Sequence, residues 1–194
     1  MRLVILALAG FVAFASSMGP EDVRKNSLAA LESVALGTTP EKVQNGKDFY
    51  KYLFTEHPEV RKYFKGAESF TADDVQKSDR FAVQGMALLT SVHILADTYD
   101  NVIFLNPSLG NSVMYLIHLL QEMIFRAFVR DLMNRHKERG LDPKLWKDFW
   151  GIFEKFLESR KPLTADQKTA LDTMGTRFND EAQKQLAVLG LPHT

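Results

Sequence analysis

Three side chains with metal-binding or hydrogen-bonding chemistry fall on apolar helical stripes of this 194-residue chain. His136 ends one stripe, Tyr50 follows Gly46 by one turn, and Gln84 precedes Leu88 by one turn. A neutral imidazole can bind a metal through one ring nitrogen while the other donates a hydrogen bond. A phenol hydroxyl and an amide NH₂ are neutral donors, which would stabilise a polarised diatomic ligand.

Each of these residues also has a structural interpretation. His136 could be a core histidine bonded to a backbone carbonyl or a tyrosine, and Gln84 could be a satisfied buried amide or lie at the edge of its stripe. Tyr50 could be a core ring with its hydroxyl at the rim. Spacing along the chain does not show that the three side chains meet, so both interpretations stay open from the residues alone.

The elements that must position these residues are predicted to be helices. Residues 122–138 form a predicted helix with His136 on its apolar face and Gly140 as its C-terminal cap. Alternating runs flanked by hairpin turns are absent from the sequence. The chain therefore predicts an all-α fold of six or more helices in one domain, with start signals at Pro20, Thr39-Pro40, Thr71 with Asp74, Asp142-Pro143 and Thr164 with Gln167.

Composition excludes several function classes. The 24 basic and 24 acidic residues leave a formal net charge of zero, which argues against a nucleic-acid partner. The chain has no cysteine, which excludes disulfides, thiol catalysis, iron–sulfur clusters and cysteine-rich zinc sites. A neutral surface neither requires nor excludes a homo-oligomer.

Residues 1–17 have the pattern of a secretory signal peptide. Arg2 provides the positive start, residues 3–15 are small or apolar, and Ala13 and Ala15 form an A-x-A cleavage pattern. The apolar run is too short to span a bilayer comfortably. We therefore predict an exported protein with a mature domain over 18–194 and no stable membrane span; a membrane anchor or a start at Met18 are the alternatives.

Two stretches resemble the nematode-type globins. "GKDFYKYLF" and the sequence that follows to residue 89 resemble the distal half of that family, and "FRAFVRDLMNRH" with the following helix resembles its proximal half. The resemblance extends from about residue 22 to the C-terminus, and the landmark residues keep family spacing when 102–121 are skipped. It implies a globin fold of about eight helices packed around a haem pocket.

The resemblance also implies a role for each site residue. His136 matches the axial ligand of the iron in haem b (iron protoporphyrin IX). Tyr50 and Gln84 match the distal donors to molecular oxygen, Phe64 matches the phenylalanine on the haem face, and Leu88 matches an apolar distal residue. The implied function is secreted, reversible oxygen binding with high affinity, as a carrier, store or scavenger and not as an enzyme. The alternatives are a haem enzyme with peroxidase or nitric oxide dioxygenase activity, and a haem-free interaction module of globin shape.

Residues 102–121, "VIFLNPSLGNSVMYLIHLLQ", depart from the family pattern. Skipping them joins "ADTYDN" directly to "EMIFRAFVRD". The segment begins with Val, whose codons start with GT, and ends with Gln, which CAG can encode, so both ends match intron boundaries. It is therefore interpreted either as a retained intron or gene-model error, or as a genuine loop that would lie before the proximal helix and disturb haem seating.

Overall fold

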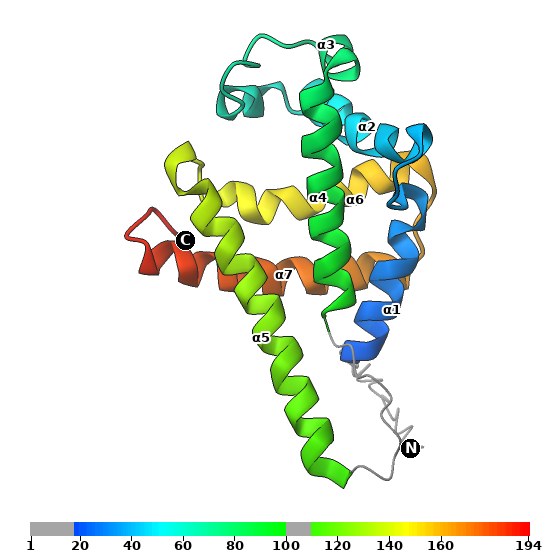
Figure 1. The fold of residues 1–194 in the computed structure, drawn as a ribbon, viewed down its shortest axis with the longest axis vertical. Coiled ribbons are helices and arrows are strands. Elements are labelled where there is room, and N and C mark those ends of the chain that lie inside the picture. Colours follow the sequence, from blue (N-terminus) through cyan, green and yellow to red (C-terminus); the bar gives the residue numbers. More distant parts are fainter. Residues whose placement is uncertain (1–17, 100–109) are drawn as a thin grey trace, which may run out of the picture.

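The computed structural model describes residues 18–99 and 110–194, so the predicted signal peptide and residues 102–109 of the atypical segment lie outside it. Within the described ranges the chain is helical and contains no strand, which confirms the predicted all-α class (Figure 1). The helices, with 3₁₀ helices labelled η, are α1 (Pro20–Ala30), η1 (Leu31–Val34), α2 (Pro40–Glu56), η2 (Pro58–Tyr63), α3 (Ala72–Lys77), α4 (Asp79–Asp97), α5 (Gly110–His136), η4 (Lys137–Arg139), α6 (Lys144–Arg160) and α7 (Ala165–Val188).

Local residue chemistry sets several helix ends. Thr71 and Asp74 form a reciprocal capping box at the start of α3, and Thr164 and Gln167 form another at the start of α7. Each box satisfies two backbone N–H groups that a helix start leaves unpaired. Gly140 has a φ of 60°, the left-handed conformation that glycine adopts most easily, and it turns the chain from η4 towards α6.

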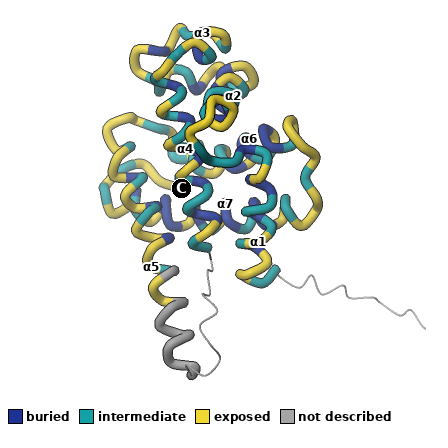
Figure 2. The backbone as a smooth tube through the Cα atoms, turned by 45° about the vertical axis from the view of Figure 1, so that its right-hand side comes forward, coloured by how far each residue is buried: buried dark blue, intermediate teal, exposed yellow. Residues whose placement is uncertain are grey.

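The helices form two crossing layers. α6 and α7 lie side by side, while α4 and α5 cross them steeply, as Figure 1 shows. Helix α1 packs against α7 and α4, which closes the N-terminal side. Buried positions lie along the inward faces of these helices, and exposed positions alternate with them along each helix (Figure 2).

The crossing of α2 and α4 depends on two glycines. A Cβ atom built on Gly46 would lie 2.5 Å from the backbone carbonyl carbon of Gly85, and one built on Gly85 would lie 2.4 Å from that of Gly46. Such distances leave no room for any side chain, so the two backbones touch directly. Tyr50 lies one turn after Gly46, and Gln84 directly precedes Gly85. The contact therefore fixes the separation of two predicted donors.

Aromatic rings fill the space between the layers. The Phe49 ring is fully buried and contacts Tyr50, Phe149, Phe153 and Phe156 with ring centroids 5.3–6.0 Å apart. Most of these pairs are edge-to-face or tilted, the arrangements that aromatic quadrupoles favour. The 14 phenylalanines of the chain thus supply much of the core, as their abundance indicates.

Helix α5 differs from the prediction at its N-terminus. The expected helix over 122–138 begins instead at Gly110 and ends at His136. Residues 110–121 are thus helical and continuous with the proximal helix, so their interpretation as a loop is wrong. The sequence after Gly110 contains neither glycine nor proline up to residue 136, so nothing in it ends a helix. In Figure 1 this part of α5 extends beyond the rest of the helices.

Candidate functional site

A cavity of about 350 Å³ lies between α2, α4, α5 and α6. All five residues predicted as site residues line it: Tyr50, Phe64, Gln84, Leu88 and His136. Tyr50 comes from α2, Gln84 and Leu88 from α4, and His136 from the end of α5. The fold thus brings together residues that the sequence spacing alone could not join. Their position around one cavity does not by itself assign a role to any of them.

His136 has one ring nitrogen engaged. Its Nδ1 lies 2.8 Å from the carbonyl oxygen of Leu132, which can only accept, so Nδ1 carries the proton. Burial lowers the pKa of His136, and nearby Arg139 and Arg135 lower it further, which favours the neutral ring. In that tautomer Nε2 has a free lone pair. The indole of Trp146 stands edge-on to the ring, with centroids 5.4 Å apart.

His136 therefore has features both of a core histidine and of a metal-binding histidine. The backbone carbonyl expected for a core histidine is present at Nδ1. The cavity expected for a metal-binding histidine is present as well, because His136 lines it. A neutral imidazole that donates through one nitrogen and offers the other is the usual form of a metal-binding histidine.

The distal side of the cavity carries Tyr50 and Gln84. Burial raises the pKa of Tyr50 to about 12, so its phenol stays protonated and able to donate. Gln84 Oε1 is buried without a hydrogen-bond partner among the described residues. A buried polar atom left unpaired is uncommon in a folded protein and indicates a functional position or an external partner. Gln84 is therefore not the satisfied core amide of the structural interpretation.

Phe64 and Leu88 supply apolar surface beside these donors. The Phe64 ring stands edge-on to Tyr50 and to Phe54, with ring centroids 5.6 Å and 5.0 Å apart. These two contacts hold the ring in place directly after η2. Leu88 is half-buried one turn after Gln84. Apolar side chains beside Tyr50 and Gln84 leave less room for water, and hydrogen bonds are stronger where water is excluded.

Two arginines and several aromatic rings of the cavity were missed by the sequence analysis. Arg135 and Arg139 line it, together with Trp146, Phe149 and Trp150. The indole Nε1 of Trp150 is buried and has no acceptor within the described part of the chain. The aromatic-rich stretch around residues 145–153 was a visible signal for the rings, whereas the arginines lay off the apolar stripe and gave none.

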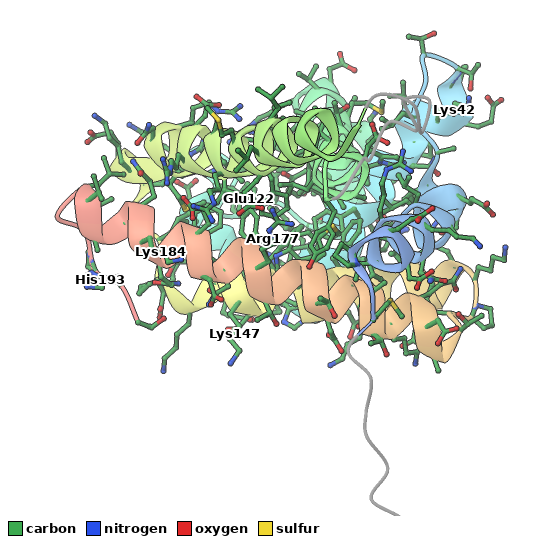
Figure 3. All side chains as sticks on the ribbon, turned by 90° about the horizontal axis from the view of Figure 1, so that it is seen from below. Lys42, Glu122, Lys147, Arg177, Lys184 and His193 are labelled. Atoms are coloured by element: carbon green, nitrogen blue, oxygen red, sulfur yellow. The ribbon has the colours of Figure 1, made fainter. Side chains whose placement is uncertain are left out.

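Ionic contacts hold α5 against α7. Arg130 Nε lies 2.6 Å from Glu181 Oε1, and that carboxylate is almost fully buried. Arg177 pairs with Glu122 and lies over the rings of Tyr99 and Phe125, with its guanidinium carbon 4.6 and 4.3 Å from their centroids. Figure 3 shows Glu122 and Arg177 pointing towards each other between the two helices. These contacts fasten α5 to α7 at Glu122 and at Arg130.

The described residues, 18–99 and 110–194, lack two further features. They contain no cluster of three or more histidine, cysteine, aspartate or glutamate side chains arranged to hold a metal. Among them, no helix is both long and apolar enough to cross a membrane.

Comparison with known proteins identifies the family. The sequence profile of the globins matches residues 47–182, which include Tyr50, Phe64, Gln84, Leu88 and His136. The chain belongs to the globin family. Its fold is thus that of an oxygen-binding haem protein, as the resemblance to nematode-type globins implied.

Nematode relatives cover almost the whole globin chain. It is 60% identical over 190 residues to a "globin-like host-protective antigen" of Trichostrongylus colubriformis, which covers 97% of this chain and 98% of that protein. It is 46% identical over 193 residues to the "globin, cuticular isoform" of Nippostrongylus brasiliensis, covering 98% and 99%. A solved globin-like protein of Caenorhabditis elegans superposes with a TM-score of 0.79 at 38% identity, covering 92% of this chain and all of that one.

Proposed function

We propose that this globin is a secreted protein that binds oxygen reversibly at haem b, with His136 as axial ligand and with Tyr50 and Gln84 as donors. One observation carries the proposal: the imidazole, the phenol and the Gln84 amide, whose Oε1 is unpaired, line the same largely apolar cavity. Phe64 and Leu88 complete the surface against which a flat, apolar group would pack.

The residues of the cavity fit haem in three respects. His136 offers Nε2 while Leu132 holds Nδ1, which is the arrangement that an axial ligand needs. Arg135 and Arg139 line the cavity and can pair with the propionate carboxylates of haem. The aromatic and aliphatic lining suits the porphyrin faces, since ligand pockets are mostly apolar with a few placed polar groups.

Bound haem supplies an iron that takes up and releases oxygen, and the chain supplies everything that tunes this exchange. The Tyr50 hydroxyl remains a donor over the whole physiological range because its pKa is about 12. Gln84 adds an amide donor from α4. A hydrogen bond to a group with charge contributes roughly 1.5–3 kcal/mol. Two such bonds would slow oxygen release by roughly a hundredfold or more, which predicts high affinity and slow dissociation.

A carrier, store or scavenger fits this site better than an enzyme. Donors that stabilise bound oxygen slow its release, which favours retention of oxygen over turnover. Peroxidase or nitric oxide dioxygenase activity remains the second candidate, and the comparison of peroxide turnover with oxygen dissociation and autoxidation rates separates the two.

Export is proposed from the N-terminal pattern. Residues 1–17 carry the signal-peptide features described above, and one relative is named as a cuticular isoform. Expression of the whole chain in eukaryotic cells, followed by N-terminal sequencing of protein from the medium, tests both export and the cleavage site. Retention of uncleaved protein inside the cells would contradict the proposal.

The axial role of His136 is tested by His136→Gly. We expect the reduced variant to lose the absorption bands of histidine-ligated haem, and we expect added imidazole to restore them by filling the space of the missing ring. His93→Gly is the matched control, because His93 Nδ1 makes the same 2.8 Å contact to an i−4 carbonyl but the ring does not line the cavity. Equal spectra for wild type and His136→Gly would refute the ligand assignment, and a wild type without a Soret band after haem addition would favour the haem-free module.

The role of the distal phenol is tested by Tyr50→Phe. Removing one hydroxyl should speed oxygen dissociation roughly 10- to 100-fold, as expected for one lost hydrogen bond to a polarised ligand. Stopped-flow displacement by carbon monoxide gives the rate. Tyr52→Phe is the control, because Tyr52 belongs to the same helix and does not line the cavity. An unchanged rate in Tyr50→Phe would exclude the proposed donor.

A further inference from the structure

A second, smaller cavity lies against His136. Its volume is about 110 Å³, and its lining shares His136, Leu141 and Trp146 with the main cavity. These three side chains therefore form a wall between two spaces. A ring in such a wall is not held on all sides by close packing, so its orientation depends on what builds the far side of the smaller cavity.

The far side of the smaller cavity is built partly by the C-terminal segment, residues 189–194. Gly190 takes a left-handed turn with a φ of 67°, and Leu191 N then donates to the Leu186 carbonyl at 3.0 Å. The segment turns back beside α7, where Figure 3 marks it by His193. Leu191 and Pro192 contribute their side chains to the cavity lining.

Gln183 of α7 connects this segment to the corner before α6. Its side chain is 8% exposed and makes three hydrogen bonds. Its Oε1 accepts from the backbone N–H of Thr194 at 2.9 Å. Its Nε2 donates to the Pro143 carbonyl at 3.2 Å and to Asn179 Oδ1 at 3.1 Å. One buried amide thus ties two parts of the chain that are far apart in sequence.

The hydrogen bonds of Gln183 to Pro143 and to Thr194 both hold parts of the chain that lie beside His136. The Pro143 carbonyl also accepts from the backbone N–H of Trp146 at 3.3 Å, and the Trp146 indole stands edge-on to the His136 ring. The other connection fastens Thr194 and so keeps Leu191 and Pro192 in the wall opposite His136. Buried polar groups that are fully satisfied in this way specify one arrangement of a core.

We propose that Gln183 is a positioning residue for His136, acting through Trp146 on one side and through the C-terminal segment on the other. This inference rests on the proposed function for its consequence at the iron, but the position of the imidazole relative to Trp146 is a property of the chain itself. Gln183 and the last residues of the chain thereby set how the axial histidine presents Nε2.

The test uses three variants that cut different connections. Gln183→Met keeps the length of the side chain and removes all three hydrogen bonds. Gln183→Glu keeps an oxygen acceptor for the Thr194 N–H group and loses the two hydrogen bonds donated to Pro143 and Asn179. It replaces Gln183→Met in the test if the methionine variant does not fold. A chain that ends at Gly190 keeps Gln183 and removes Leu191, Pro192 and Thr194.

Two readouts separate positioning from general stability. In the ferrous haem-loaded protein, we expect the iron–histidine stretching band in the resonance Raman spectrum to shift and broaden in Gln183→Met and in the shortened chain, with a smaller shift in Gln183→Glu. In the haem-free protein, we expect nuclear Overhauser contacts between the His136 and Trp146 rings to weaken in the same order.

Gln185→Met is the matched control. Gln185 lies on the same helix, and its side chain bonds to Asn134 of α5 at 3.0 Å but reaches neither the corner nor the C-terminal segment. Wild-type ring contacts in both Gln183→Met and the shortened chain would overturn the proposal, as would an equal change in Gln185→Met. Altered ring contacts in a protein that takes up no haem would support the positioning role and contradict the proposed function, so the two failures are distinguishable.

Discussion

The two sides of the cavity are held in different ways. On the distal side, α2 and α4 touch through the backbones of Gly46 and Gly85, and no side chain separates them. On the proximal side, α5 is held to α7 by Arg130 with Glu181, and the corner before α6 is held by Gln183. Tyr50 and Gln84, the proposed donors, are thus placed by steric contact, and His136, the proposed axial ligand, is placed by polar contacts.

Because of this difference, we expect the two sides of the cavity to tolerate substitutions differently. Steric contact between backbones cannot adjust, because interiors are closely packed and an added methyl group must displace a whole helix. Polar contacts can be weakened gradually and leave the helix close to its place. The distal side should therefore fail by loss of packing, whereas the proximal side should fail by loss of charge pairing or hydrogen bonding.

The largest expected effect comes from Gly85→Ala. The new methyl group would lie 2.4 Å from the carbonyl carbon of Gly46, so α2 and α4 must separate. We expect a loss of about 3 kcal/mol in the free energy of unfolding, at the upper end for overpacking. Urea unfolding followed by circular dichroism measures it.

Gly151→Ala is the matched control for this substitution. Gly151 lies inside α6, and a Cβ there would meet no atom within 4 Å. Alanine should raise the stability by about 0.5–1 kcal/mol, because glycine in a helix is entropically unfavourable. The same sign for both substitutions would show that the glycine contact does not hold the distal side.

A smaller effect is expected from Arg130→Ala on the proximal side. It leaves the Glu181 carboxylate, whose side chain is 6% exposed, without its partner. We expect a loss of about 2 kcal/mol, typical of a hydrogen bond to a buried charged group. Arg126→Ala, one turn earlier on α5, removes a pair with the more exposed Glu122 and should cost about 0.5 kcal/mol or less. Thermal unfolding of both variants measures the difference, and equal losses would contradict the proximal half of the comparison.

The smallest expected effect is the pH dependence from His93 of α4. Burial lowers its pKa below the ordinary 6.5, so the folded chain binds fewer protons than the unfolded chain just below that value. The contribution of His93 to the free energy of unfolding should be fully present above pH 6.5, and it should fall as the pH drops towards the lowered pKa. His93→Gln should reduce this loss between pH 7 and 5, measured by chemical unfolding at each pH. A pH profile in His93→Gln identical to that of the wild type would exclude His93 as a cause.

Local signals in the sequence predicted most of the fold. The capping boxes at Thr71 and Thr164 and the left-handed turn at Gly140 depend on residues within a few positions of each other, and all three formed. The predicted start of α5 was wrong: family spacing places the helix start after residue 121, but no glycine or proline between residues 111 and 121 interrupts a longer helix. Complementary DNA across residues 102–121 still tests whether the segment belongs to the protein.

The site was predictable only in part. Tyr50, Gln84 and His136 stood out because each is polar on an apolar stripe, and the family resemblance joined them. Gln183 gave no comparable signal, because two of its three partners lie 40 residues earlier and 11 residues later in the chain, and only the fold brings them together. Gly85 could have been noticed, since glycine inside a helix usually has a packing reason.

The direct contact between Gly46 and Gly85 also limits how this chain can diverge. A single substitution at Tyr50 or Gln84 would change a proposed donor and leave this backbone contact in place. Neither glycine can change first, because every other residue adds a Cβ that collides with the opposite backbone. The polar groups at positions 50 and 84 can therefore vary during evolution. The separation of α2 and α4, which sets the distance between those groups, is fixed because neither Gly46 nor Gly85 has a side chain.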